Sequence, residues 1–285
     1  MSDVKAVTPA PLNIRAILRQ YGLRPSKGLG QNFLVDETIL KYIVICAGVS
    51  RQDTVLEIGP GLGSLTRHLA LAADKVVAVE LDQKLFPALE TILNPFPNIR
   101  LLQGDILKLA LADLVPQEEY LVVANIPYYI TSALVRHLLE STPRPRRIVL
   151  TVQKEIAERI CAERKLSLLA VSVQVYGKPS IQMQIPAEAF FPVPNVDSAL
   201  VQIEISPSPL VQPEHLETFF QIARSGFGQK RKTLRNSLSA GLNIPASEME
   251  SLLSFTGIDP QRRAETLSLA EWGKLTDGYL DRKSR

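Results

Sequence analysis

The alternation of short apolar runs with helix-length segments constrains the fold of this chain more than any other feature. Runs rich in β-branched residues recur between positions 54 and 152, and the stretches between them are long enough for helices. Strands that alternate with helices form βαβ units on a parallel sheet. The sequence therefore predicts an α/β fold with a Rossmann-like, doubly wound sheet, whose strands lie at 54–58, 75–80, 99–103, 120–124 and 147–152.

The rest of the chain predicts an antiparallel edge and a helical domain. Strand-like runs at 170–176 and 199–205, with a shorter run at 180–185 between them, could close one edge of the sheet. The segment SPSPLVQP after Ile205 is typical of a linker. We expect a cofactor-binding domain over 1–207 and a small helical domain over 208–285, with helices at 215–224, 230–240, 246–255 and 269–280.

A glycine-rich turn joins the first predicted strand to a helix. In the run Glu57-Ile-Gly-Pro-Gly-Leu-Gly63, glycines let the backbone approach a ligand without interference from a Cβ atom. A dinucleotide-binding turn has glycines at its first, third and sixth places, whereas here they occupy the first, third and fifth. The spacing argues against a nicotinamide cofactor and favours a nucleotide cofactor without a pyrophosphate.

Carboxylates stand at the ends of the next two strands. Glu80 ends the second strand, where a carboxylate can accept hydrogen bonds from both hydroxyls of a ribose. Asp105 follows the third strand at the same sheet edge and is placed to accept from an adenine amino group. An aspartate after a strand is equally typical of a helix N-cap, so both interpretations of Asp105 stay open.

The tetrapeptide Asn125-Ile126-Pro127-Tyr128 follows the fourth strand directly. The N6 amine of adenine is a poor nucleophile because its lone pair is delocalised into the ring. The Asn125 side-chain oxygen and the Ile126 carbonyl can accept its two hydrogens and favour a pyramidal, reactive nitrogen. Pro127 stiffens the turn, and Tyr128 offers a face on which an extruded base can stack.

Other classes of site find little support. Cys46 and Cys161 lie far apart and do not cluster with His68, His137 or His215, so we expect neither a metal nor a disulfide. The longest apolar stretches are shorter than the ~18 residues that span a bilayer, and the N-terminus lacks a signal pattern, which predicts a cytoplasmic protein. The formal charge of +3 is too small to indicate a nucleic-acid partner by itself.

Four motifs together resemble one known family. They are Gln31-Asn-Phe-Leu34, the glycine-rich turn at 57–61, Asn125–Tyr128 and Phe190-Phe-Pro-Val-Pro-Asn-Val-Asp-Ser198. In order and spacing they resemble the rRNA adenine N6-dimethyltransferases, which include the bacterial 16S rRNA enzymes and the erythromycin-resistance 23S rRNA enzymes. The resemblance implies S-adenosylmethionine as cofactor and adenine N6 in RNA as the methyl acceptor.

The resemblance also assigns roles position by position. Asn32 and Leu34 match a segment that folds over the cofactor, Leu34 through its backbone, and Phe190 matches a ring that helps to sandwich the adenine, although Phe191 stands beside it. The residues implied to bind S-adenosylmethionine are Asn32, Leu34, Gly59, Gly61, Glu80, Asp105 and Asn125. Those implied to act at the adenine are Asn125, Ile126, Pro127, Tyr128 and Phe190.

The C-terminal sequence resembles the small-subunit branch of the family. Arg231 and Arg235 are four residues apart, which on a helix puts both on one face, while Leu234 and Leu238 share another. Lys230, Arg231, Lys232 and Arg235 are therefore expected to contact RNA phosphates, and Arg144, Arg146 and Arg147 to extend that surface. The implied partner of this monomer is small-subunit rRNA or a pre-30S particle.

The sequence thus predicts an enzyme that dimethylates N6 of two adjacent adenines near the 3′ end of 16S rRNA. A 23S rRNA methyltransferase of the resistance type is a second reading, which the C-terminal sequence disfavours. A non-catalytic RNA- or DNA-binding relative is a third, which the intact Glu80 and Asn125–Tyr128 disfavour. A nicotinamide oxidoreductase is the fourth, and the glycine spacing argues against it.

Overall fold

A seven-stranded mixed sheet forms the centre of the structure. The computed structural model describes residues 9–116, 119–127 and 130–283. The strand order is β4-β3-β2-β5-β6-β9-β7, with β2 to β6 parallel and β9 antiparallel to β6. These strands are β2 (Thr54–Ile58), β3 (Lys75–Glu80), β4 (Ile99–Gln103), β5 (Tyr120–Asn125), β6 (Arg147–Gln153), β7 (Gly177–Ile185) and β9 (Ser198–Ile205). The predicted parallel strands and the antiparallel edge at 199–205 are confirmed.

The strand order places a ligand site at one end of the sheet. The order reverses at β2, because β3 lies on one side of it and β5 on the other. In open α/β sheets, ligands bind beyond the carboxyl ends of the strands at such a switch point. Gly59, Glu80, Asp105 and Asn125 all end or follow strands there.

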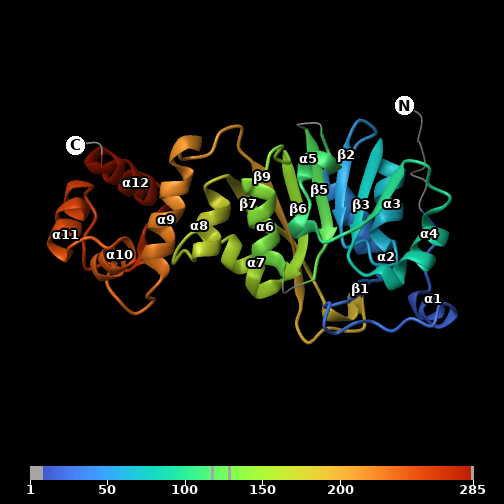
Figure 1. Ribbon diagram of the computed structural model, residues 1–285. Helices are drawn as coiled ribbons and strands as arrows, with labels where there is room; N and C mark the ends of the chain where they lie inside the picture. The colour runs from blue at the N-terminus through green and yellow to red at the C-terminus, as the bar shows by residue number, and fades with distance from the viewer. Residues whose placement is uncertain (1–8, 117–118, 128–129, 284–285) are drawn as a thin grey trace, which may run out of the picture. The chain divides into compact units, whose positions relative to one another are not determined.

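Helices pack beside the sheet (Figure 1), and the apolar side chains of the central strands are buried. Asp36 caps α2 by accepting from the backbone N–H groups of Thr38 and Ile39. The buried side of α2 packs with α3 against β2, β5 and β6, in a core that includes Leu40, Leu69 and Val123. The helices of this unit are α1 (Ile14–Gln20), α2 (Glu37–Ala47), α3 (Ser64–Ala72), α4 (Phe86–Leu93), α5 (Leu111–Leu114) and α6 (Thr131–Glu140).

A short two-stranded sheet ties the N-terminal part of the chain to a distant segment. Strand β1 (Phe33–Leu34) pairs in the antiparallel direction with β8 (Phe190–Phe191). We call residues 9–35, which run from before α1 through β1, the N-terminal strap. In Figure 1 the strap, drawn in blue, runs from α1 to β1 below the lower ends of the strands of the main sheet.

The predicted strand at 170–176 is wrong, since these residues belong largely to helix α8 (Leu168–Gln174). Their alternating valines favour a strand. However, the Ser167 hydroxyl accepts from the N–H of Ala170 and caps a helix, and Ala170 to Val173 are buried without alternation. Burial on all sides therefore outweighs strand propensity, and the run at 180–185 supplies β7 instead.

The chain divides into two compact units. The first comprises residues 1–157 and 180–205, and the second comprises 158–179 and 206–285. The predicted boundary near 207 falls two residues from the observed one, but 158–179 groups with the C-terminal unit, where α8 packs on α9 and the rings of Tyr176 and Phe220 stack with centroids 6.0 Å apart. Helix α7 (Lys154–Ile160) crosses a unit boundary, and α9 (Leu216–Phe227), α10 (Leu234–Leu242), α11 (Ala246–Phe255) and α12 (Leu269–Lys283) complete the second unit.

Candidate active site

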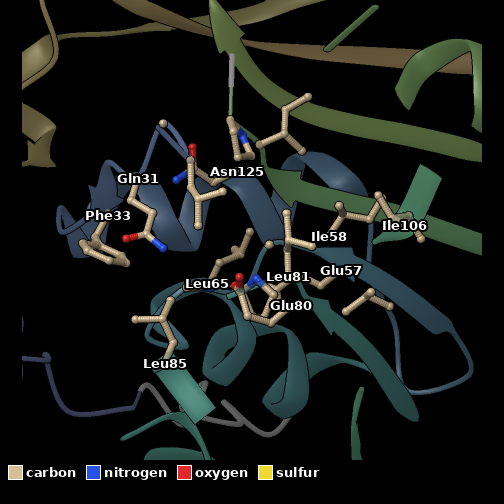
Figure 2. A pocket seen from close by; sticks show the side chains of 18 of the residues that line it. Gln31, Phe33, Glu57, Ile58, Leu65, Glu80, Leu81, Leu85, Ile106 and Asn125 are labelled. Carbon is tan, nitrogen blue, oxygen red and sulfur yellow. Dashed lines mark hydrogen bonds between the residues drawn. The ribbon is translucent and has the colours of Figure 1, made fainter. Parts of the chain in front are cut away.

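A cavity of about 230 Å³ lies at the switch point of the sheet, within the first unit. The glycine-rich turn, the ends of β3 and β5, and the strap all line it. Figure 2 shows Gln31, Glu80 and Asn125, which come from three separate segments, around this one cavity. Of the residues predicted to bind the cofactor, Asn32, Leu34, Gly59, Gly61, Glu80, Asp105 and Asn125 all line it.

The Glu80 carboxylate is buried and held in place by backbone donors. Its Oε2 accepts from the N–H of Gly61 at 3.0 Å, and its Oε1 accepts from the N–H of Asp82 at 2.8 Å. Burial raises the pKa of Glu80, and these two N–H donors oppose the rise. Each oxygen keeps a lone pair, so the carboxylate can still accept two hydroxyl hydrogens from a ribose.

The glycine-rich turn requires glycine for reasons of both conformation and space. Gly61 has φ +62°, in the left-handed region that side chains disfavour. A Cβ atom there would lie 3.0 and 3.1 Å from two ring carbons of Phe33. The strap therefore packs directly on the turn.

Asn125 connects the target end of the cavity to the strap. Its Nδ2 donates to the backbone carbonyl of Asn32 at 3.2 Å. Because Nδ2 makes that bond, Oδ1 is the atom of the amide that can accept from a ligand. Ile126 and Pro127 also line the cavity, as predicted from their sequence position, whereas Tyr128 lies outside the described residues.

Asp105 serves as a helix cap and also lines the cavity. Its Oδ1 accepts from the N–H of Leu107 at 3.1 Å, and its Oδ2 lies 3.3 Å from Nζ of Lys108. The two interpretations of this residue are therefore compatible.

Sequence reasoning left two polar residues of the cavity without a role. The Gln31 amide donates to Oδ2 of Asp82 at 2.8 Å, which fixes the strap to the loop after Glu80. Glu57 is 1% exposed, and its Oε2 has no hydrogen-bond partner among the described residues. Burial, with the nearby Glu80 charge, raises the pKa of Glu57 to about 8. The only sequence signal for either residue was its place in a motif.

The position of Phe190 differs from that expected of a ring that sandwiches a base. Phe190 is 2% exposed and packs in the core with Leu34 and Leu200, and it does not line the cavity. The neighbouring Phe191 is half-buried, and the Arg15 guanidinium lies 4.8 Å from its ring centroid. Strand alternation explains the difference, because β8 turns consecutive side chains to opposite faces.

The predicted C-terminal cations do not share a helical face. Helix α10 begins at Leu234, so Arg231 lies in the preceding turn, exposed with Lys230 and Lys232. Arg235 is half-buried, and its Nη1 lies 2.8 Å from a carboxylate oxygen of Glu250. Leu234 and Leu238 are fully buried, which confirms the predicted docking face of this helix.

The arginines before β6 form contacts within the first unit. Arg146 pairs with Asp53 at 2.6 Å, and Arg147 pairs with Glu204 at 2.5 Å. Arg144 donates to the carbonyl of Leu139. These residues lie at the amino end of β6, whereas the cavity lies at the carboxyl ends of the parallel strands. These contacts brace that end of the sheet, and the RNA contact predicted for the three arginines stays a prediction.

The described residues contain no cluster of metal-ligating side chains. Among the helices of these same ranges, none combines the length and the apolar character that crossing a bilayer requires.

Comparisons with known proteins agree with this geometry. The ribosomal RNA adenine dimethylase family model matches residues 23–279. A ribosomal RNA small subunit methyltransferase A of Dehalococcoides mccartyi is 46% identical, over 93% of this chain and 92% of its own length. The ribosomal RNA small subunit methyltransferase A of Alkaliphilus oremlandii is 38% identical, over 94% of this chain and 96% of its own length.

Solved structures show the same fold. A dimethyladenosine transferase from Plasmodium falciparum has a TM-score of 0.74 and 25% identity, over 88% of this chain and 98% of its own. The 23S rRNA methyltransferase ErmE has a TM-score of 0.69 and 29% identity, over 87% and 99%. The fold and the cavity thus define an enzyme of the Rossmann-like methyltransferase class. More specifically, the chain belongs to the ribosomal RNA adenine dimethylase family.

Proposed function

We propose that this protein transfers methyl groups from S-adenosylmethionine to N6 of two adjacent adenines near the 3′ end of 16S rRNA, as the small subunit matures in the cytoplasm. The observation that carries the proposal is that Asn125 and Glu80 border one cavity, with Nδ2 of Asn125 fixed by the strap. Ribose recognition and activation of an amine can therefore occur side by side. We propose that the enzyme acts as a monomer.

The cavity fits S-adenosylmethionine by its donor set. The Glu80 carboxylate suits a ribose, Asp105 suits an adenine amino group, and the turn at Gly59 and Gly61 leaves room for close backbone approach. The cofactor, when bound, supplies an electrophilic methyl group. Asn32 and Leu34 of the strap complete the proposed binding set.

The chain's own residues prepare the target amine. Oδ1 of Asn125 and the carbonyl of Ile126 accept the two hydrogens of N6, which draws the lone pair out of the ring and directs it into the cavity. The proton leaves after transfer, so no strong general base is required. For the second methylation only one hydrogen remains, and one acceptor gives up its bond.

The two rival activities are distinguishable. The small-subunit relatives are 38–46% identical, compared with 29% for the 23S enzyme, which favours the small-subunit substrate. The test is methyl transfer from labelled S-adenosylmethionine to small and large ribosomal subunits lacking these modifications, followed by mass mapping of the rRNA. Label confined to 23S rRNA, or no label at all, would refute the proposal.

We also propose that the C-terminal unit contacts RNA. The exposed Lys230, Arg231 and Lys232 are the cations that carry this role, because Arg235 is engaged by Glu250.

A further inference from the structure

The N-terminal strap carries positive charge only. Residues 9–35 contain Arg15, Arg19, Arg24 and Lys27, and no aspartate or glutamate. Without these four cations the formal charge of the chain, +3, would become −1. The strap therefore carries a net charge of +4, which exceeds the formal charge of the whole chain.

All four cations are exposed, and none forms an ion pair with a carboxylate of the described residues. Basic residues elsewhere in the same unit often have acidic partners, as in the pairs Lys108–Asp105 and Arg136–Glu140. Exposed cations without interspersed acids give a surface a positive potential, which attracts an anionic partner.

The strap presents this charge beside the cavity. Lys27 begins the turn that leads into the lining, since its carbonyl accepts from the N–H of Gly30 at 3.0 Å. The Arg15 guanidinium lies over Phe191, which pairs with Phe33 between β1 and β8. Such a cation–π contact orders the guanidinium while leaving its N–H donors available to an oxyanion.

From this placement we infer that the strap is a second RNA-binding surface, on which Arg15, Arg19, Arg24 and Lys27 contact phosphates of the strand that flanks the target adenine. The inference rests on the proposed function, because it takes RNA as the polyanion. An adenine that enters the cavity brings its own backbone to the mouth, where exposed cations can contact the flanking phosphates.

RNA bound to the strap would also affect the binding of S-adenosylmethionine. The strap is bonded to Asp82 through Gln31 and to Asn125 through the carbonyl of Asn32. A ligand that holds the strap down stabilises both contacts. RNA and S-adenosylmethionine should therefore bind with positive cooperativity, and each should raise the affinity for the other by the same factor.

The test compares two pairs of charge-neutralising substitutions in the full-length protein. Arg19→Gln with Arg24→Gln removes two strap cations that do not line the cavity. Lys75→Gln with Arg100→Gln removes two exposed cations, at the amino end of β3 and near that of β4. The probe is the unmethylated small ribosomal subunit, and the readout is the slope of log K against log salt.

We expect the strap pair to make that negative slope shallower by roughly 1.4–1.8, which corresponds to two lost phosphate contacts, and to weaken binding about tenfold at low salt. The control pair should keep the parental slope. Calorimetry with S-adenosylmethionine alone should give the parental affinity for both pairs, and only the strap pair should lose the cooperativity with RNA.

Equal slopes for the two pairs would overturn the inference, whether both match the parent or both fall. Failure of the proposed function is separate, because it would appear as a parental protein that methylates no adenine of the small subunit.

Discussion

The side chain of Asn125 donates to the backbone carbonyl of Asn32, 3.2 Å away, so the end of β5 is hydrogen-bonded directly to the N-terminal strap. The residue proposed to activate the amine is thus oriented by the segment proposed to cover the cofactor. The position of the strap and the orientation of the Asn125 amide are therefore coupled.

Asn125→Ala should lower the rate of methyl transfer by about 10²–10³, because it removes a preorganised acceptor that acts in the transition state. Affinity for the small subunit should change little, since phosphate contacts supply most of it. Single-turnover transfer measures the rate. Asn94→Ala removes an exposed amide outside the cavity and should be silent. A parental rate for Asn125→Ala would refute the two-acceptor mechanism.

Glu80→Ala should weaken S-adenosylmethionine binding by about 10–100-fold, the loss of a charge-assisted interaction worth roughly 1.5–3 kcal/mol. The variant also loses the acceptor that holds the N–H of Gly61. Calorimetry measures the affinity, with Glu90→Ala on the exposed side of α4 as the matched control. Glu80 has no ribose role if its variant binds as tightly as the control.

Gly61→Ala should loosen the strap. The added Cβ atom would lie 3.0 Å from the Phe33 ring, and the alanine would have to adopt φ near +62°. Gly257→Ala is the matched control, because Gly257 has φ +73° with no atom within 4 Å of an added Cβ. Both variants carry backbone strain of about 1–2 kcal/mol. Only Gly61→Ala should also reduce S-adenosylmethionine affinity, and equal affinities would show that the Phe33 contact is unimportant.

Glu57→Gln should change how stability depends on pH. The folded protein keeps a proton on Glu57 up to about pH 8, whereas the unfolded chain releases it near 4.5. The unfolded state therefore binds fewer protons between these values, and this group makes stability fall as pH rises through that window. The Tm of the variant minus the Tm of the parent should be larger at pH 8 than at pH 5. Each kcal/mol shifts Tm by about 2–4 °C. A difference that is the same at both pH values would contradict this.

Arg231→Gln should weaken binding to the small subunit and reduce its salt dependence, while Arg235→Gln should have a smaller effect because Glu250 engages Arg235. Filter binding across a salt series compares them. The assignment of the RNA contact to the turn before α10 fails if Arg235→Gln has the larger effect.

The sequence predicted those parts of the fold that depend on local pattern. The central parallel strands could be predicted because each is a short run that is buried almost throughout, and the cavity could be predicted because polar residues such as Glu80 and Asn125 end such runs. The run around Val171 was misassigned because its alternation is local, whereas its burial by α9 depends on tertiary packing.

The partners of individual side chains could not be predicted from the sequence. The sequence does not indicate that Asp53 holds Arg146, because the two lie 93 residues apart, or that Glu250 on the next helix holds Arg235. The burial of Phe190 likewise depends on the pairing of β8 with β1, which joins segments about 150 residues apart. Charge and aromatic motifs indicate candidates, and only the fold decides which of them face a ligand.

The backbone donors that fix Glu80 have a consequence for turnover. The N–H groups of Gly61 and Asp82 orient the carboxylate before any ligand binds. Its proposed hydrogen bonds to the ribose therefore do not depend on the charge at the sulfur of the cofactor. The demethylated cofactor has the same ribose and should be held there as firmly as the methyl donor. Each additional methyl on an adenine requires a fresh cofactor, so we expect strong product inhibition, with cofactor exchange setting the pace of dimethylation.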